Sequence, residues 1–184
     1  KAFRHFIEFL RIPTLIITDI DTVCRKVGGK RITYPACSVS DTNCCNTSNA
    51  TIKYYYEAPE FVYGCSVHDA WLENIKNHCQ KCVSDFVNVS YQSEENGYYP
   101  RSFEDAFINV NLAELKEQKS QLLGLKNIDE MDTSDDIYDL TKEIIDKKSD
   151  FASSLLYIAY TDKNVEWTTP KYIEEGLEWL QKQQ

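Results

Sequence analysis

The sequence predicts an α/β fold in which a strand lies buried in a parallel sheet. Residues 15–17 (Leu-Ile-Ile) form an unbroken apolar run, and Pro13 prevents a helix from continuing into it. Such a short run is typical of a strand that is covered on both faces, as in a parallel sheet. Residues 86–92 alternate apolar and polar side chains, which predicts a second strand.

Apolar residues at helical spacing predict most of the remaining elements. The expected helices are residues 1–10, a helix beginning at Asp69, a helix at 102–110 that continues through 112–125, then 137–148 and a last helix beginning at Pro170. Proline suits the first position of a helix. The side chains of this last helix that we expect to be buried are Tyr172, Ile173, Leu177 and Leu180.

Glycines and polar residues mark the expected turns and loops. Gly28 and Gly29 are expected to turn a small hairpin between residues 23–27 and 31–34. Residues 35–52 are rich in Ser, Thr, Asn and Cys, so we expect a loop. Residues 129–136 are acidic and small, which predicts a mobile or solvated linker.

Two acids directly after the first strand form the main candidate site. Asp19 and Asp21 are separated by Ile20, so in an extended chain both carboxylates point one way while Ile20 turns to the core. Ligands of open α/β sheets bind at the carboxyl ends of strands. Carboxylate oxygens in that position suit Mg²⁺ or Mn²⁺. Solvated acids that cap a strand end explain the pattern equally well.

Four further candidates have ordinary structural explanations. Ser102 has the residue type of a helix N-cap, and Glu104 lies in the first turn, where the helix dipole favours an acid. Spacing alone therefore favours a structural role for Glu104 over a metal ligand. Arg101 either contacts DNA phosphate or is simply exposed. Lys148 either faces a phosphate or complements the C-terminus of the helix expected at 137–148.

Composition limits the partners of this 184-residue chain. Its net charge of -9 argues against attraction of the whole surface to nucleic acid. Local binding through metal ions and a few basic residues stays open. No apolar run approaches the length of a membrane span, and the start is not a signal peptide. The sequence has no phosphate-cradling Gly-x-x-x-x-Gly-Lys loop and no Gly-x-Ser-x-Gly elbow.

All seven cysteines lie between Cys24 and Cys82. An odd number without a secretion signal predicts reduced thiols in a cytoplasmic protein. Cys79 and Cys82 have Cys-x-x-Cys spacing, but a structural zinc needs two further ligands, and no second well-spaced pair exists. The other available ligands are Cys44, Cys45, Cys65 and His68. If 69–83 is a helix, Cys79 and Cys82 share a face and can simply be core, which we favour over zinc.

Six stretches, in this order, resemble one known family. They are residues 9–21 (FLRIPTLIITDID), 47–53 (TSNATIK), 91–97 (YQSEENG), 101–108 (RSFEDAFI), 148–152 (KSDFA) and 170–180 (PKYIEEGLEWL). The series covers nearly the whole chain. It resembles the C-terminal TOPRIM nuclease region of the OLD-family ATP-dependent endonucleases, which are bacterial proteins of anti-phage type.

The resemblance implies one TOPRIM nuclease domain over residues 1–184. Its Rossmann-like parallel sheet would be flanked by helices, with a polar, cysteine-bearing insertion at about 34–85 and a helical C-terminal part at about 102–184. Two divalent metals, Mg²⁺ or Mn²⁺, are implied as well. The matching positions are Asp19 and Asp21 for the Asp-x-Asp metal ligands, Ser102 and Glu104 for a later Ser-x-Glu element, and Lys148 for the lysine that faces the scissile phosphate.

One departure from the family limits what this chain is expected to do alone. The family's glutamate pair before the Asp-x-Asp strand and its ATPase half have no match here, so we expect a fragment that carries one side of the site. Residues 1–10 also open inside an amphipathic helix. ATP would act only through the missing N-terminal domain, DNA is the expected partner, and the full-length protein is expected to form a homo-oligomer.

Two alternatives to a nuclease stay open. The first is a non-catalytic TOPRIM-like module that binds nucleic acid or a partner protein. The acidic surface favours a protein partner under this hypothesis. The second is a zinc-stabilised interaction domain that depends on Cys79 and Cys82.

Overall fold

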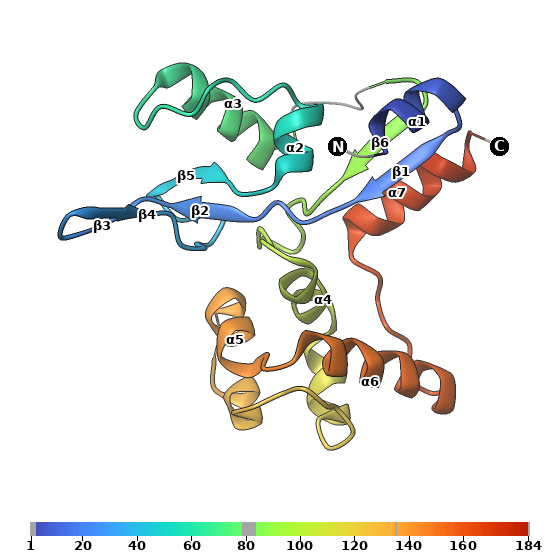
Figure 1. The fold of residues 1–184 in the computed structure, drawn as a ribbon. Helices are drawn as coiled ribbons and strands as arrows, with labels where there is room; N and C mark the ends of the chain where they lie inside the picture. The colour runs from blue at the N-terminus through green and yellow to red at the C-terminus, as the bar shows by residue number, and fades with distance from the viewer. Residues whose placement is uncertain (1–2, 79–83, 135, 184) are drawn as a thin grey trace. The chain divides into compact units, whose positions relative to one another are not determined.

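The computed structural model describes residues 3–78, 84–134 and 136–183. The chain divides into two compact units. The first unit comprises Lys1–Ser102 and Lys171–Gln184, and the second comprises Phe103–Pro170. Each unit is described by itself (Figure 1).

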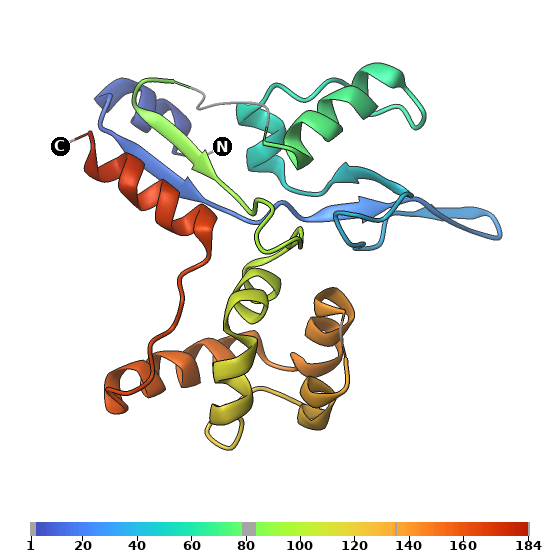
Figure 2. The same ribbon diagram turned by 180° about the vertical axis from the view of Figure 1, so that it is seen from behind.

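A parallel strand pair lies at the centre of the first unit. Strand β1 (Thr14–Ile17) pairs with β6 (Val87–Ser90) so that Thr14 lies opposite Val87 and Ile17 opposite Ser90. Helix α7 (Lys171–Gln181) lies along this pair (Figure 2). Gly176 makes the close approach possible, since a Cβ atom there would lie 3.0 Å from both Leu15 Cδ1 and Ser90 Oγ. The parallel pairing expected for this α/β protein is confirmed, whereas a larger Rossmann-like sheet is not found among the described residues.

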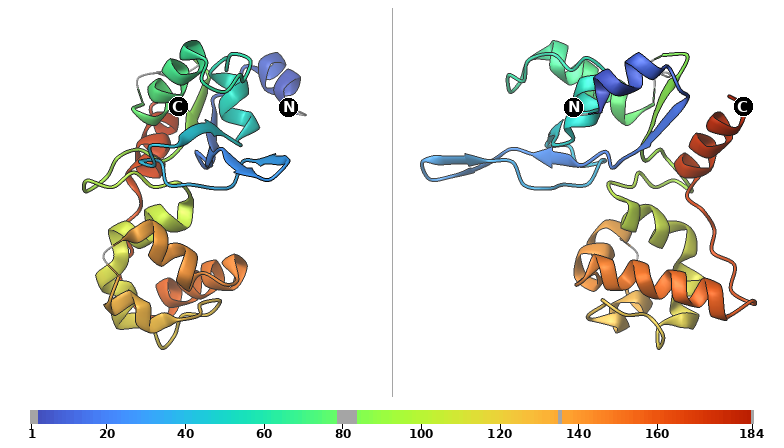
Figure 3. Two further views of the ribbon diagram at one scale, coloured as in Figure 1. Left: turned by 90° about the vertical axis from the view of Figure 1, so that its left-hand side faces the viewer. Right: turned by 45° about the vertical axis from the view of Figure 1, so that its right-hand side comes forward.

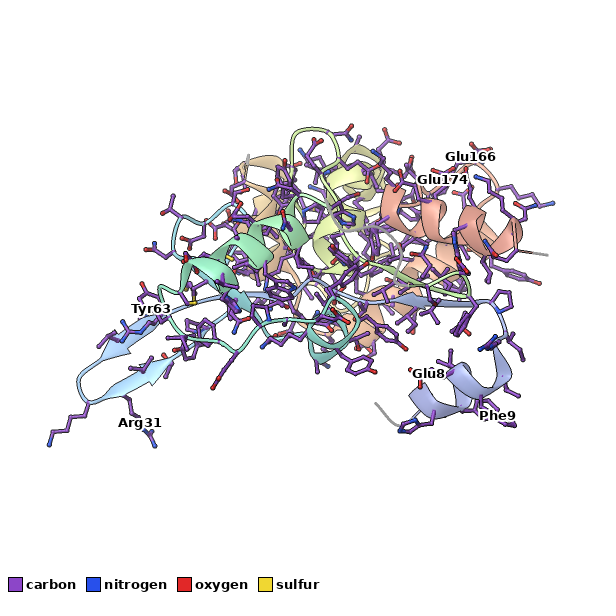
Figure 4. All side chains as sticks on the ribbon, turned by 90° about the horizontal axis from the view of Figure 1, so that it is seen from above. Glu8, Phe9, Arg31, Tyr63, Glu166 and Glu174 are labelled. Atoms are coloured by element: carbon purple, nitrogen blue, oxygen red, sulfur yellow. The ribbon has the colours of Figure 1, made fainter. Side chains whose placement is uncertain are left out.

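Two expectations about burial in this region are wrong. Strand β1 is not fully buried, because Leu15 and Ile16 are only half-buried and Ile17 is 44% exposed. In α7, the expected burial of Tyr172 is confirmed, but Leu177 is 51% exposed and Gly176 is buried beside Tyr172. Helix α1 (Arg4–Leu10) also leaves Phe6 exposed, together with Phe9, which is labelled in Figure 4.

Two short antiparallel pairs follow Asp21. Strand β2 (Thr22–Cys24) pairs with β5 (Cys44–Thr47), and β3 (Lys26–Gly28) forms a hairpin with β4 (Arg31–Thr33). The turn uses Gly29 at φ 60°, a left-handed conformation that glycine adopts without strain. The predicted hairpin is confirmed. Arg31, which is labelled in Figure 4, begins its second strand.

Residues 35–52 are not the continuous loop that their polar composition predicts. They contain β5 and the start of helix α2 (Ala50–Tyr55), which Asn49 caps. Helix α3 (Ser66–Lys76) follows and buries Trp71, Leu72 and Ile75, as expected. The core of this unit consists of Ile20, Val39, Ile52, Tyr56, Trp71, Leu72, Ile75, Val87, Val89 and Tyr91.

The second unit is helical (Figure 3). Helix α4 (Phe103–Gln118) confirms that the helix expected at 102–110 continues past residue 112, but it ends at Gln118 and not at residue 125. The acidic linker expected at 129–136 contains a 3-10 helix, η1 (Ile128–Asp132), because Met131 is fully buried and anchors it to the core. The core residues are Phe107, Ile108, Leu115, Leu122, Met131, Leu140, Ile144, Phe151, Leu155, Ile158 and Val165.

The helix expected at 137–148 is two helices. Helix α5 (Ile137–Ile144) ends early, and α6 (Lys148–Thr161) begins at Lys148. The carbonyl of Gly124 accepts hydrogen bonds from the backbone N–H groups of Asp146 and Lys147, each at 2.9 Å, and these bonds hold the chain between the two helices. Among the described residues, no helix is both long enough and apolar enough to cross a bilayer.

Candidate active site

The two candidate acids lie just beyond the carboxyl end of β1. Ile20 is 1% exposed, so its predicted burial is confirmed, while Asp19 and Asp21 are half-buried. Asp21 has φ 50°, in the left-handed region that Asp adopts more readily than most residues. The chain therefore turns at Asp21, and simple strand alternation does not extend through it. Asp21 N–H donates to the Arg101 carbonyl at 3.3 Å.

Gln92 fixes Asp19 from the neighbouring strand. It is 2% exposed and follows β6 by two residues. Its Nε2 donates to Asp19 Oδ1 at 2.6 Å, and its Oε1 accepts from the Ile20 N–H at 2.7 Å. Nε2 also donates to the Tyr172 hydroxyl at 3.2 Å. A neutral amide thus orients the Asp19 carboxylate without neutralising its charge.

Asn49 holds the backbone of the same turn. Its Nδ2 donates to the Asp19 carbonyl at 2.6 Å and to Thr18 Oγ1 at 2.7 Å. Its Oδ1 accepts from the N–H groups of Thr51 and Ile52 as the N-cap of α2. The composition of residues 35–52 gives no signal for this role. Gln92, by contrast, could have been found by asking which side chain follows the strand parallel to β1.

Arg101 pairs with Asp21. Its guanidinium nitrogen lies 2.9 Å from Asp21 Oδ1, and its Nε donates to the Thr22 carbonyl at 3.1 Å. The Arg101 side chain is 19% exposed, so the explanation that Arg101 is simply an exposed residue is wrong. The structure therefore joins a predicted DNA-contacting residue to a predicted metal ligand.

In the second unit, Glu104 pairs with Lys148. Glu104 lies in the first turn of α4 and is 11% exposed, and Lys148 Nζ lies 2.8 Å from its Oε2. Lys148 begins α6, so the explanation that it complements a helix C-terminus is wrong. A cation at a helix N-terminus opposes the helix dipole. The contact with Glu104 supplies a local reason for a lysine at this position.

The remaining predicted residues are placed as follows. Ser102 is buried in the first unit, directly before α4, and its role as a metal ligand stays a prediction. Cys79 and Cys82 lie outside the described residues. The structure thus joins Asp21 with Arg101 and Glu104 with Lys148, within one unit in each case.

Comparison with known proteins relates the chain to a nuclease. It is 32% identical over 194 aligned residues to Endonuclease GajA of Bacillus cereus (strain HuB5-5), an OLD-family nuclease. The match covers 98% of this chain and 25% of GajA, so the chain spans about a quarter of that relative. No family model and no solved structure matches the chain. The chain is therefore a distant homologue of part of an endonuclease.

Proposed function

We propose that this chain is the TOPRIM nuclease portion of a metal-dependent DNA endonuclease of the OLD family. The observation that carries the proposal is its similarity to Endonuclease GajA over nearly the whole chain. The position of Asp19 and Asp21 at the carboxyl end of a parallel strand agrees with it, since α/β proteins bind ligands there. Under this proposal, β1 and β6 belong to the Rossmann-like TOPRIM sheet.

The donor atoms of the acids fit Mg²⁺ or Mn²⁺. Asp19 and Asp21 present hard oxygens at a partly open turn, and the neutral amide of Gln92 orients the Asp19 carboxylate. Asp19, Asp21, Ser102 and Glu104 would be the metal ligands. Metal bound there supplies charge that activates water and stabilises the leaving oxygen of a phosphodiester.

Arg101 and Lys148 would contact the phosphates of DNA. In the structure each of them neutralises one of the acids. Lys148 is 64% exposed, so its ammonium can turn from Glu104 to a phosphate at little cost in burial. Arg101 is more enclosed and also bonds the Thr22 carbonyl, so it would contact phosphate without leaving its position. Two basic residues can thus bind DNA locally on a chain whose net charge is -9.

The wider setting of the activity follows from the same proposal. Cleavage would be coupled to ATP through a separate domain, in a cytoplasmic homo-oligomer that acts in defence against phage. The support for this setting is the similarity of the chain to Endonuclease GajA.

A plasmid-nicking assay on the full-length protein tests the proposal. The wild type is expected to convert supercoiled plasmid to nicked circles with Mg²⁺ or Mn²⁺, and Asp21→Asn is expected to lose this activity while remaining folded. Asp85→Asn is the matched control, because Asp85 is exposed in the turn that precedes β6, at the opposite end of the β1–β6 pair. A folded Asp21→Asn protein that nicks at the wild-type rate would instead favour a non-catalytic module.

A further inference from the structure

We propose that Cys24, Cys37, Cys44 and Asp41 bind a structural zinc ion in the first unit. The Sγ atoms of Cys24 and Cys37 and a carboxylate oxygen of Asp41 all lie within 4.8 Å of one another. In a tetrahedral zinc site with Zn–S bonds near 2.3 Å, the ligand sulfurs lie about 3.8 Å apart. Small side-chain movements would therefore bring these atoms to bonding distance. Within residues 3–78, 84–134 and 136–183, no other group of three or more such side chains is this close.

Cys44 supplies the fourth ligand. It lies directly opposite Cys24 in the antiparallel β2–β5 pair, so the two side chains share a face of the sheet. Its thiol is close enough to the thiol of Cys37 for the two groups to interact. The sulfur of Cys37 is thus the common neighbour of the other three ligands.

Backbone hydrogen bonds hold the ligand-bearing segments together without the metal. Residues 35–37 run along β2, since Cys24 N–H donates to the Pro35 carbonyl at 3.0 Å and Cys37 N–H to the Thr22 carbonyl at 3.2 Å. In the turn before β5, Cys44 N–H donates to the Asp41 carbonyl at 2.9 Å.

The Asp41 carboxylate is itself fixed within this turn. Its Oδ1 accepts from the backbone and side-chain nitrogens of Asn43 at 2.7 and 3.1 Å. Both bonds use the same oxygen, so the other oxygen of Asp41 is available for the ion.

The ligand chemistry selects zinc over the metals proposed for the nuclease. Three thiolates are soft ligands, which Mg²⁺ and Mn²⁺ do not favour. Four protein ligands close the coordination sphere, as in structural rather than catalytic zinc sites. Three thiolates and a carboxylate also carry more negative charge than the ion neutralises. Lys76 and its ion-pair partner Glu73, both on α3, act on Cys44 with opposite charges.

The proposed ion would add a cross-link to the small sheet that these backbone hydrogen bonds hold. Strands β2 and β5 form a sheet of only two short strands, which is marginal in water without a further constraint. Strand β2 begins at Thr22, directly after Asp21. A zinc ion at Cys24, Cys37, Cys44 and Asp41 would therefore also hold the chain that leaves the candidate active site.

Metal analysis of the protein, purified without chelators from zinc-supplemented medium, tests the proposal. We expect one zinc ion per chain in the wild type, near-complete loss in Cys37→Ser, and full retention in Cys45→Ser. Cys45 is a matched control because it is the next residue in β5 and is buried, but its thiol donates to the Val23 carbonyl at 3.6 Å. Zinc-free wild type would overturn the proposal. So would loss of zinc in a Cys79→Ser, Cys82→Ser double variant but not in Cys37→Ser.

A second measurement decides the matter if Cys37→Ser does not fold. Co²⁺ substituted into the wild-type protein is expected to show the strong thiolate-to-metal charge transfer and the tetrahedral d–d bands of a site with three sulfur ligands. Weak octahedral bands would contradict the proposal. A Cys37–Cys44 disulfide found by mass spectrometry of freshly purified, unreduced protein would contradict it equally.

Discussion

In the first unit, Asp19 is held by the buried amide of Gln92, whereas in the second unit Glu104 is held by the exposed ammonium of Lys148. Gln92 is fixed by three hydrogen bonds and does not neutralise its acid. Lys148 does neutralise its acid, through a contact that water and salt can reach. The first arrangement is rigid and the second is exchangeable.

This difference assigns different tasks to the two units. Under the proposed function, Asp19 could bind a metal ion while it keeps its hydrogen bond to Gln92. Glu104 would have to exchange the Lys148 ammonium for the metal, which would free Lys148 for a phosphate. We therefore expect mutations in the first unit to change the orientation of the acids, and mutations at the start of α6 to change the response to substrate.

The largest effect is expected from Lys148→Met. If this lysine offsets charge on the reacting phosphate, plasmid nicking should fall by about 100-fold or more, as when other transition-state contacts are removed. Stability should change by less than about 1 kcal/mol, because the pair with Glu104 is largely exposed on the lysine side. Lys147→Met is the control, since Lys147 is exposed and directly precedes the first residue of α6. Equal activity in both variants would break the distinction between the two units.

Gly124→Ala should destabilise the second unit strongly. Gly124 has φ 71°, and an added Cβ would collide with the Lys147 carbonyl and lie 2.7 Å from Phe151 N. We expect a loss of about 2–3 kcal/mol in the free energy of unfolding, measured by urea denaturation. Gly97→Ala has a similar φ of 78° with nothing within 4 Å, so it should lose only about 1 kcal/mol. Similar losses in both variants would show that the backbone contact at the start of α6 is unimportant.

Gln92→Leu tests the rigid arrangement in the first unit. It removes the acceptor of the buried Ile20 N–H and one donor to Asp19, which should cost about 2 kcal/mol. The temperature of thermal unfolding and the affinity for Mn²⁺ should both fall. Gln121→Leu is the comparison, because Gln121 is exposed and bonds only Gln118 among the described side chains. A Gln92→Leu protein with wild-type stability would contradict the role assigned to this amide.

The smallest effect is a pH dependence that belongs to the first unit. Burial against Phe61 and Trp71 lowers the pKa of His68, whose two ring nitrogens have no hydrogen-bond partner among the described residues. The unfolded chain therefore takes up this proton first as the pH falls below about 6.5. Stability should be complete above that pH and decrease below it, by at most about 1.4 kcal/mol per pH unit. His68→Phe should remove this component in denaturation experiments between pH 5 and 7.5, and an unchanged slope would exclude His68 as its source.

The sequence predicts the acids of the candidate site better than their partners. The apolar run before Asp19 and Asp21 identifies the strand and its end without knowledge of the rest of the fold. Gln92 is missed because a neutral amide has no charge signature, and only the pairing of β1 with β6 brings it to Asp19. The sequence offers Cys44 as an available zinc ligand but does not connect it with Cys24, because their spacing is irregular and only the β2–β5 pairing brings the two residues together.

Errors in helix boundaries have the same origin. The spacing of apolar residues in 137–148 continues through a break that the distant Gly124 carbonyl imposes. In α7, the expected burial of Leu177 fails because Gly176 provides the close approach to β1 and β6. Local periodicity predicts that a helix exists, while its ends and its buried face depend on contacts from far along the chain.

Calorimetric titration of Mn²⁺ tests most directly whether both units take part in metal binding. We would titrate the full-length protein and its Asp19→Asn and Glu104→Gln variants, with Asp85→Asn as the control. The proposed metal ligands predict weaker binding in both variants and unchanged binding in the control. Binding that neither variant alters would contradict the proposed metal site, and the nuclease function would then rest on similarity to Endonuclease GajA alone.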